Sequence, residues 1–295
     1  MARILDGRAA ALALRQRLVG RMASLRDAGV VPQLVLIQVG DDPASTVYVR
    51  SKAKGCAELG IRSRTLRPAA DVAIGPLREE IHALNRDPQV HGILLQLPLP
   101  ATLDENLLLA EIDPAKDVDG FHPINVGRLC LGLSGFVPAT PLGILRLLQH
   151  HAVPVEGRRV VILGRSRLVG RPLANLLSSR SPEGNATVTL CHTRSRDLAA
   201  ITREAEILVA AVGRPRFVTA EMVGGDAVVI DVGMHREPDP GRPDCTKLCG
   251  DVDFAAVEPR VSAISPVPGG VGPMTVACLL ENTVRAAEWA AGIGT

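Results

Sequence analysis

Three polar residues in the first half of the chain have the spacing and the chemistry of a small catalytic set. The segment Ser45-Thr-Val-Tyr48-Val-Arg-Ser-Lys52 carries a hydroxyl, a phenol and an amine at intervals of three and four residues. On a helix, residues at these intervals share one face. A phenol and an amine one turn apart can orient a substrate and move a proton. We therefore take Tyr48 and Lys52 as candidate catalytic residues and Ser45 as a candidate contact to the substrate.

A glycine-rich segment more than a hundred residues later, Gly164–Pro172, has the context of a nucleotide-binding loop. It follows a predicted strand over 159–163 and precedes a predicted helix, where backbone amides face an anion. Gly164 permits a tight turn and Gly170 allows close packing. Ser166 takes the place of the second glycine of Gly-x-Gly-x-x-Gly, and the last glycine comes one residue late. An ordinary strand–helix turn is the alternative interpretation.

The order of these two motifs predicts two domains. Short-chain dehydrogenases also carry Tyr-x-x-x-Lys, but their pair follows the glycine-rich loop, whereas Tyr48 and Lys52 precede it. The first half of the chain would supply the catalytic residues and the second half the nucleotide-binding loop. We therefore expect a substrate cleft between two domains.

The end of the next predicted strand indicates which nucleotide binds. An NAD-binding enzyme commonly ends this strand with an acidic residue for the ribose hydroxyls. Here the strand ends in Cys191-His-Thr193-Arg194-Ser-Arg196, without an acid. Together with Arg165, these arginines suit a 2′-phosphate, which a guanidinium recognises well. The pattern favours NADP over NAD, with solvated surface arginines as the alternative.

The segment Ser265–Thr275 is too dense in glycine and proline for the interior of a strand or helix. Val267-Pro268 is a candidate cis bond, as is Leu97-Pro98. Gly269 and Gly270 let the backbone approach a flat ligand closely. We therefore expect Pro268, Gly269 and Gly270 to form a wall of the ligand site, and a structural crossover loop is the alternative.

Two more polar residues complete the candidate site. Asp119, in Lys116-Asp-Val-Asp-Gly120, offers an acceptor for a paired N–H donor edge such as an aminopyrimidinone, although a surface turn with a Lys–Asp pair is the simpler interpretation. Gln96 ends a predicted buried strand, where it would be costly to bury without a hydrogen-bond partner. A metal at Asp117 and Asp119 lacks further ligands nearby, so we expect no metal.

Composition restricts the class of protein. The 295 residues suffice for two α/β domains, and 46% are hydrophobic. Only 2% are aromatic, which disfavours nucleic-acid binding by stacking, and a net charge of +2 gives no strong attraction to polyanions. We expect no membrane span, no signal peptide and free thiols in a cytoplasmic protein. The six cysteines are Cys56, Cys130, Cys191, Cys245, Cys249 and Cys278.

Hydrophobic patterning predicts alternating strands and helices, hence βαβ units on parallel sheets. The predicted strands span 33–39, 61–66, 92–97, 159–163, 186–190, 207–211 and 227–231. The predicted helices span 9–25, about 45–59, 75–85, 103–110, 141–151, 173–179, 197–204 and 276–291. We expect a catalytic domain over 1–140, a Rossmann-type domain over 141–275, and a last helix, 276–295, that packs back on the first.

These motifs together resemble the bifunctional methylenetetrahydrofolate dehydrogenase/methenyltetrahydrofolate cyclohydrolase (FolD) family over essentially the full chain. The matching segments are Tyr48–Lys52 with Gly60-Ile61, Gly92–Pro100, Lys116–Gly120, Pro138–Pro141, Gly164–Pro172, Asp231–Gly233, Gly250–Asp253 and Pro266–Thr275. The resemblance implies an N-terminal folate-binding domain, a C-terminal NADP-binding domain and a homodimer in one-carbon metabolism and purine biosynthesis.

The resemblance also implies a role for each site residue. Lys52 would be the essential acid/base, Tyr48 would position the folate, and Gln96 would tune Lys52. Asp119 would bind the pterin, and Pro268 and Gly269 would line the folate site. The NADP contacts would come from Gly164, Arg165, Ser166, Gly170, Thr193 and Met234.

Two departures from the family pattern are visible. Ala139 replaces the cysteine of Pro-Cys-Thr-Pro, so a thiol there is not needed for the chemistry. Met234-His235 replaces Ile-Asn after Asp231-Val-Gly, which bears on the contact to nicotinamide. Two other functions remain open at this stage. One is a two-domain dehydrogenase acting on a small carbonyl or hydroxy acid, and the other is a catalytically silent NADP-binding module.

Overall fold

The structure is a computed structural model that describes residues 1–239 and 242–293. The chain forms two compact units. The N-terminal unit comprises Leu12–Ala139 together with the last helix from Val276, and the C-terminal unit comprises Met1–Ala11 and Thr140–Thr275.

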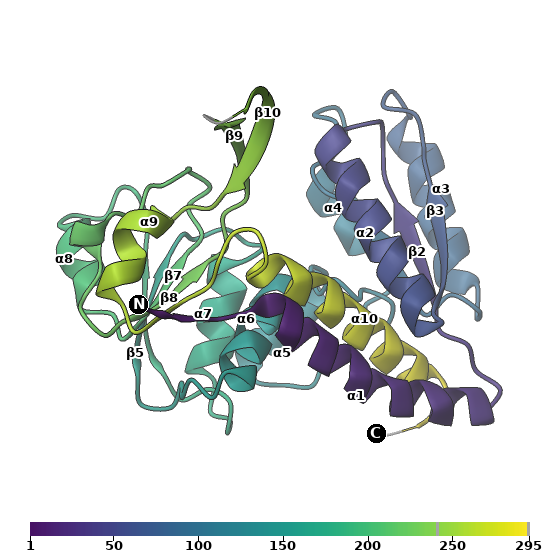
Figure 1. Ribbon diagram of the computed structural model, residues 1–295. Helices are drawn as coiled ribbons and strands as arrows, with labels where there is room; N and C mark the ends of the chain where they lie inside the picture. The colour runs from purple at the N-terminus through teal and green to yellow at the C-terminus, as the bar shows by residue number, and fades with distance from the viewer. Residues whose placement is uncertain (240–241, 294–295) are drawn as a thin grey trace. The chain divides into compact units, whose positions relative to one another are not determined.

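The N-terminal unit is built on a three-stranded parallel sheet of order β3-β2-β4. The strands are β2 (Gln33–Ile37), β3 (Arg62–Leu66) and β4 (Gly92–Leu95). They alternate with α2 (Pro43–Leu59), α3 (Ile74–Arg86), α4 (Glu105–Glu111) and α5 (Pro123–Leu131) (Figure 1). Because β2 and β4 are almost entirely buried, they lack the polar alternation of a strand with one face in water.

One face of this sheet is covered by α3 and α4. Side chains of α3 at intervals of three and four residues, Leu77, Ile81 and Leu84, pack with Ile37 of β2 and Ile93 of β4. This packing anchors the strands, so the segments that follow their carboxyl ends are positioned by a rigid support.

Two long helices complete the N-terminal unit, namely α1 (Gly7–Asp27) and α10 (Val271–Ala290), each of which also contributes one end to the other unit. Arg21 of α1 forms a bidentate ion pair with Glu288 of α10, at 2.5 and 2.8 Å. A Cβ on Gly55 of α2 would come within 3.3 Å of Val276 and Leu280, so a glycine there permits close helix packing.

The C-terminal unit contains a six-stranded sheet in which every neighbouring pair is parallel. In the order of the sheet, the strands are β1 (Arg3–Ile4), β11 (Ala263–Ile264), β8 (Val228–Asp231), β7 (Ile207–Ala210), β5 (Arg159–Leu163) and β6 (Thr187–Cys191). The chain runs from β5 to β6 on one side and then to β7 on the other. This reversal is a topological switch point, and ligands of open α/β sheets bind outside the carboxyl ends of the strands at such a point.

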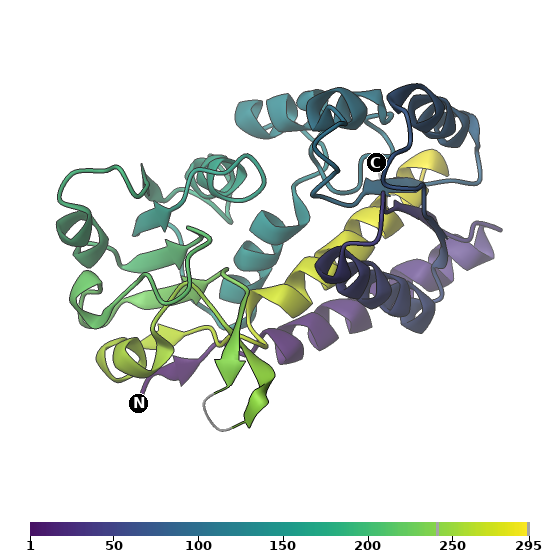
Figure 2. The same cartoon turned by 90° about the horizontal axis from the view of Figure 1, so that it is seen from above.

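Short helices and one hairpin connect these strands. The helices are α6 (Ala139–His150), α7 (Gly170–Ser178), α8 (Leu198–Arg203) and α9 (Phe254–Val257), with 3-10 turns at Ala220–Met222 and Glu258–Arg260. An antiparallel hairpin of β9 (His235–Asp239) and β10 (Arg242–Cys249) extends away from the strands of this unit (Figure 2).

The structure confirms the predicted α/β class and parallel sheets, and each predicted strand and helix lies within a few residues of an observed one. Both candidate cis bonds, Leu97-Pro98 and Val267-Pro268, are cis. Five elements were not predicted, namely α5, the β9–β10 hairpin, α9, the short edge strand β1 and its neighbour β11. No disulfide joins the cysteines whose side chains are described; the side chain of Cys245 lies outside that part.

Candidate active site

Helix α2 positions the predicted catalytic set. Asp42 caps its first turn by accepting a hydrogen bond from the Ser45 amide at 2.7 Å, and Gly60 ends it in a left-handed conformation with φ 79°. The Lys52 side chain is buried, with 8% of the residue exposed, whereas Tyr48 is 38% exposed. A lysine is rarely buried to this extent without a partner, so the contacts of its amine are informative.

The Lys52 amine faces an amide and a carboxylate. Lys52 Nζ donates a hydrogen bond to Gln96 Oε1 at 3.0 Å, and Gln96 Nε2 donates to the Leu97 carbonyl at 2.7 Å. The second bond orients the Gln96 amide so that its oxygen faces the lysine. Burial lowers the pKa of Lys52, and the negative charge of Asp119 opposes this shift. The surroundings thus favour a lysine that can reach its neutral form.

The turn that carries Asp119 is held by Asp117. The buried Asp117 carboxyl accepts hydrogen bonds from the Phe121 and His122 amides at 3.1 and 2.8 Å, and from Asn125 Nδ2 at 2.8 Å. Burial raises the pKa of Asp117 to about 7, against the effect of these donors. Burial likewise raises the pKa of Asp119, and the Lys52 charge opposes it. The two carboxyl groups therefore have different roles. Asp117 anchors the turn, and Asp119 interacts with Lys52.

The structure contradicts the interpretation of this segment as a surface turn with a Lys–Asp pair. Lys116 Nζ instead donates hydrogen bonds to the carbonyls of Leu84, Asn85 and Asp87 at the end of α3, at 2.7 to 3.0 Å. The anchoring role of Asp117 was not predicted from the sequence, where this residue was a candidate only for a metal site. Its position two residues before Asp119 was the only available signal. Among the side chains that the structure describes, no group of three could hold a metal ion.

The glycine-rich loop lies at the switch point of the C-terminal unit. Gly164 directly follows β5 and has φ 130°, and a Cβ on it would lie 2.0 Å from the Ala211 carbonyl oxygen after β7. A Cβ on Gly170, at the start of α7, would lie 1.9 Å from the Gly164 oxygen. Both positions therefore exclude any side chain. The exposed Arg165 and Ser166 follow Gly164, and Ser166 Oγ accepts a hydrogen bond from the Val169 amide at 3.0 Å.

The neighbouring turn after β6 presents the predicted phosphate-binding residues. Thr193, Arg194 and Arg196 are exposed. Two hydrogen bonds between His192 and Ser195 stabilise the turn. The Ser195 amide donates to the His192 carbonyl at 2.8 Å, and Ser195 Oγ accepts from the His192 amide at 3.1 Å. Since β5 and β6 are adjacent in the sheet, this turn and the glycine-rich loop lie at the same sheet edge.

Two further predicted site segments belong to the C-terminal unit. Met234, which follows β8, is 40% exposed. The Pro266–Gly270 loop is closed by a bond from the Gly270 amide to the Pro266 carbonyl at 2.8 Å, and the Gly7 amide donates to Gly269 at 2.9 Å. Pro268 is exposed at its tip, and Gly269 has φ 112°. Within each unit the structure thus gathers the candidates. Ser45, Tyr48, Lys52, Gln96 and Asp119 belong to one unit, and the cofactor candidates, with Pro268, Gly269 and Gly270, belong to the other.

Comparisons with known proteins match both units. Residues 5–119 match the family model described as "Tetrahydrofolate dehydrogenase/cyclohydrolase, catalytic domain", and residues 138–291 match "Tetrahydrofolate dehydrogenase/cyclohydrolase, NAD(P)-binding domain". A protein of Oleidesulfovibrio alaskensis named "Bifunctional protein FolD" is 53% identical over 97% of both chains. One of the same name from Treponema pallidum is 54% identical over 99% of this chain and 92% of its own.

Solved structures are similar over the same extent. The bifunctional enzyme FolD, methylenetetrahydrofolate dehydrogenase/cyclohydrolase, of Campylobacter jejuni has a TM-score of 0.92 at 45% identity, covering 98% of this chain and 99% of its own. The Trypanosoma brucei enzyme, solved with NADP cofactor and an inhibitor, has a TM-score of 0.91 at 39% identity and covers 98% of both chains. No helix in the described part of this chain has the length and apolar character needed to cross a membrane.

Proposed function

Because the chain belongs to the tetrahydrofolate dehydrogenase/cyclohydrolase family, we propose that it catalyses two successive reactions of one-carbon metabolism. It oxidises 5,10-methylenetetrahydrofolate to the 5,10-methenyl form with NADP⁺ and then hydrolyses that product to 10-formyltetrahydrofolate. The observation that carries this proposal is the buried Lys52, whose amine bonds Gln96 beside the Asp119 charge in a unit that matches the family's catalytic domain.

When bound, NADP⁺ would supply the redox chemistry as the hydride acceptor, and the protein would supply orientation. The Gly164 loop fits a dinucleotide, since its backbone excludes side chains at Gly164 and Gly170 and opens a helix whose amides suit a phosphate. We assign Gly164, Arg165, Ser166, Gly170, Thr193 and Met234 to cofactor binding.

Hydrolysis of the methenyl bridge is the step that needs a proton carrier. Water adds to the methenyl carbon, one proton leaves, and cleavage of a carbon–nitrogen bond opens the ring. We propose that neutral Lys52 accepts the proton from water and returns it to the nitrogen that leaves. The cationic substrate assists, because like charge disfavours the ammonium form. Gln96 holds the amine at 3.0 Å and thereby fixes its position.

We assign the remaining site residues to folate binding. Tyr48 positions the ring against Lys52, and Ser45 contributes from the same face of α2. Asp119 accepts hydrogen bonds from the aminopyrimidinone edge, which presents paired donors. Pro268, Gly269 and Gly270 line the folate site. Leu12–Ala139 with α10 from Val276 would form the folate-binding domain, and Thr140–Thr275 with Met1–Ala11 the NADP-binding domain. The predicted boundaries, 1–140 and 141–275, differ in the first eleven residues, because β1 pairs with β11 in the C-terminal sheet. We further propose a cytoplasmic homodimer that binds neither nucleic acid nor membranes.

An assay of the purified protein with 5,10-methylenetetrahydrofolate and NADP⁺ tests the proposed function. We expect NADPH to form and methenyl absorbance to rise and then decay. Nucleotide binding without turnover would identify a silent module. Turnover of a small hydroxy acid without folate would identify a dehydrogenase of another class.

Replacing Arg165 with alanine should raise the KM for NADP⁺ much more than the KM for NAD⁺. The guanidinium is suited to the 2′-phosphate that only NADP carries, and the residue is exposed at the end of β5. Steady-state kinetics with both nucleotides measure the difference. Equal changes for NADP⁺ and NAD⁺ would show that Arg165 does not read the 2′-phosphate.

Replacing Asp119 with asparagine should move the acid limb of the cyclohydrolase kcat–pH profile to lower pH. The Asp119 charge works against the burial that lowers the pKa of Lys52, so its removal lets that pKa fall further. A larger fraction of Lys52 is then neutral at a given pH. The decay of methenyl absorbance at saturating substrate, corrected for the uncatalysed rate, measures kcat separately from weaker folate binding. An unmoved limb would mean that Asp119 does not act on the titration of Lys52.

A further inference from the structure

A buried carboxylate in the C-terminal unit organises the segment that follows β7. Asp251 is fully buried, and its Oδ2 accepts hydrogen bonds from the amides of Val212 and Gly213 at 2.6 and 3.0 Å. Its Oδ1 accepts from the Arg214 amide at 3.0 Å and lies 2.7 Å from His235 Nε2. An ionised carboxylate has about four acceptor positions, so these four groups complete its hydrogen bonding. Because a carboxylate only accepts, Nε2 of His235 carries the proton in this contact.

The segment held by Asp251 adjoins the glycine-rich loop. Val212 follows Ala211, whose carbonyl oxygen occupies the space that a Cβ on Gly164 would need. The Ala211 amide in turn donates to the Leu163 carbonyl at 2.8 Å, immediately before Gly164. A shift of the 212–214 segment therefore reaches the backbone of the cofactor loop directly.

A second buried carboxylate fixes the segment that carries Met234. Asp231 Oδ1 accepts from the amides of Gly233 and Asp251, at 2.9 and 2.8 Å. A Cβ on Gly233 would lie 2.4 Å from Asp251 Oδ1, so the two segments touch without intervening side chains. Met234 lies between Gly233 and His235 in the sequence. The His235 ring contacts the same Asp251 carboxylate that adjoins Gly233. Met234, the candidate contact to nicotinamide, therefore has a hydrogen-bonded residue on each side, Gly233 before it and His235 after it.

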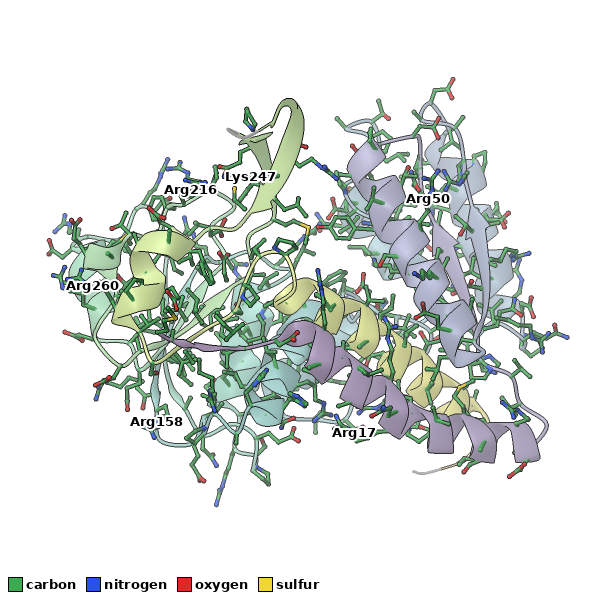
Figure 3. All side chains as sticks on the ribbon, in the orientation of Figure 1. Arg17, Arg50, Arg158, Arg216, Lys247 and Arg260 are labelled. Carbon is green, nitrogen blue, oxygen red and sulfur yellow. The ribbon has the colours of Figure 1, made fainter. Side chains whose placement is uncertain are left out.

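The contact between His235 and Asp251 should contribute more to the free energy of folding than the exposed ion pairs of the adjoining β9–β10 hairpin. Glu237 of β9 pairs with Arg216 and, at 3.5 Å, with Lys247 of β10. Arg216 and Lys247 are labelled in Figure 3. The Arg216 and Lys247 side chains are 49% and 42% exposed, and exposed pairs contribute little. The side chains of His235 and Asp251 are 21% and 0% exposed, so loss of the ring leaves a buried charge short of one partner.

We propose that His235 is a positioning residue for the dinucleotide. Through Asp251 it holds the 212–214 segment against the Gly164 loop, and through the backbone it holds Met234 at the cofactor site. The inference rests on the proposed function and adds to it a specific determinant of NADP⁺ affinity. Residue 235 acts on cofactor binding and not on Lys52 chemistry.

The test compares His235→Leu with His235→Gln in the full-length protein. Leucine keeps apolar volume but removes the donor, whereas glutamine retains an N–H group at similar reach. We expect His235→Leu to raise both the KM and the Kd for NADP⁺ by about tenfold, the scale of a lost hydrogen bond to a charged group. His235→Gln should restore most of the affinity. Hydrolysis of methenyltetrahydrofolate without nucleotide should stay within about twofold of wild type, since that step needs no bound NADP⁺.

A matched control is available in the other unit. His82 Nε2 contacts Glu111 Oε2 at 2.5 Å, also a histidine–carboxylate pair, and its side chain is 32% exposed. His82→Leu should leave NADP⁺ binding unchanged. The inference is overturned if His235→Leu binds NADP⁺ as wild type does, or if glutamine and leucine weaken binding equally. Absence of both activities from the wild-type protein would instead reject the proposed function, independently of His235.

Discussion

Replacing Lys52 with methionine should lower the rate of methenyltetrahydrofolate hydrolysis by about 10²–10⁴-fold, the usual contribution of general acid–base catalysis. Methionine keeps the length and apolar volume of the buried stem but removes the amine that bonds Gln96 at 3.0 Å. Folate binding should survive, because the helix and its packing are unchanged. The dehydrogenase reaction should suffer less, since hydride transfer itself moves no proton. Parallel measurement of methenyl decay and NADPH formation separates the two effects.

Lys54→Met is the matched control for this experiment. Lys54 lies on the same helix, but its side chain is 79% exposed, and it contacts Glu58 at 3.8 Å. Its loss removes a charge from α2 at a surface position and should leave both activities near those of wild type. Hydrolysis that continues unchanged in Lys52→Met would show that Lys52 has only a packing role and would remove the proposed catalytic centre.

Replacing Asn282 with leucine should reduce the free energy of unfolding by about 2–5 kcal/mol, because one buried and one partly buried carbonyl lose their donor. Asn282 of α10 is fully buried, and its Nδ2 donates to the carbonyls of Val118 and Val137 at 2.8 and 3.0 Å. Val118 precedes Asp119, so the KM for folate should rise as well. Urea denaturation gives the stability, and steady-state kinetics give the KM.

Thr283→Val provides the comparison on the same helix. Thr283 is equally buried, but its hydroxyl donates to the Leu279 carbonyl one turn earlier and links no separate segment. Its loss should cost less than Asn282→Leu and should leave the folate KM unchanged. If the two variants were equally stable and bound folate equally well, the link from α10 to the Asp119 turn would have no energetic importance.

Local pattern was sufficient for much of the fold and for the choice of candidates. Short apolar runs alternating with amphipathic stretches predicted the three strands of the N-terminal sheet and four of the six strands of the C-terminal sheet. A strand buried on both faces needs continuous aliphatic residues, and such a run is visible in the sequence. The glycines of the Gly164 loop and the cis bonds at Leu97-Pro98 and Val267-Pro268 were also predicted, since these depend on residue type and immediate neighbours. Lys52 and Tyr48 were recognised for the same reason, because their helical spacing is local.

Two of the strands that escaped prediction, β1 and β11, depend on partners distant in sequence. β1 is two residues long and exists through its pairing with β11, some 260 residues later. Such non-local pairing leaves no repeating pattern in the sequence. The β9–β10 hairpin pairs neighbouring segments, but most of its residues are polar, so it lacks the short apolar runs that predicted the other strands.

The amino-acid sequence by itself determined which side chains are available for chemistry, and the tertiary structure decided how those side chains are tuned. Nothing local distinguishes Asp117 from Asp119, yet one anchors its turn and the other faces Lys52. Similarly, His235 stood out only as an unusual residue until the fold placed it 2.7 Å from the buried Asp251. The physical reason is that desolvation and hydrogen bonding depend on what surrounds a group in three dimensions, and burial sets both the pKa of Lys52 and the importance of each donor around Asp251.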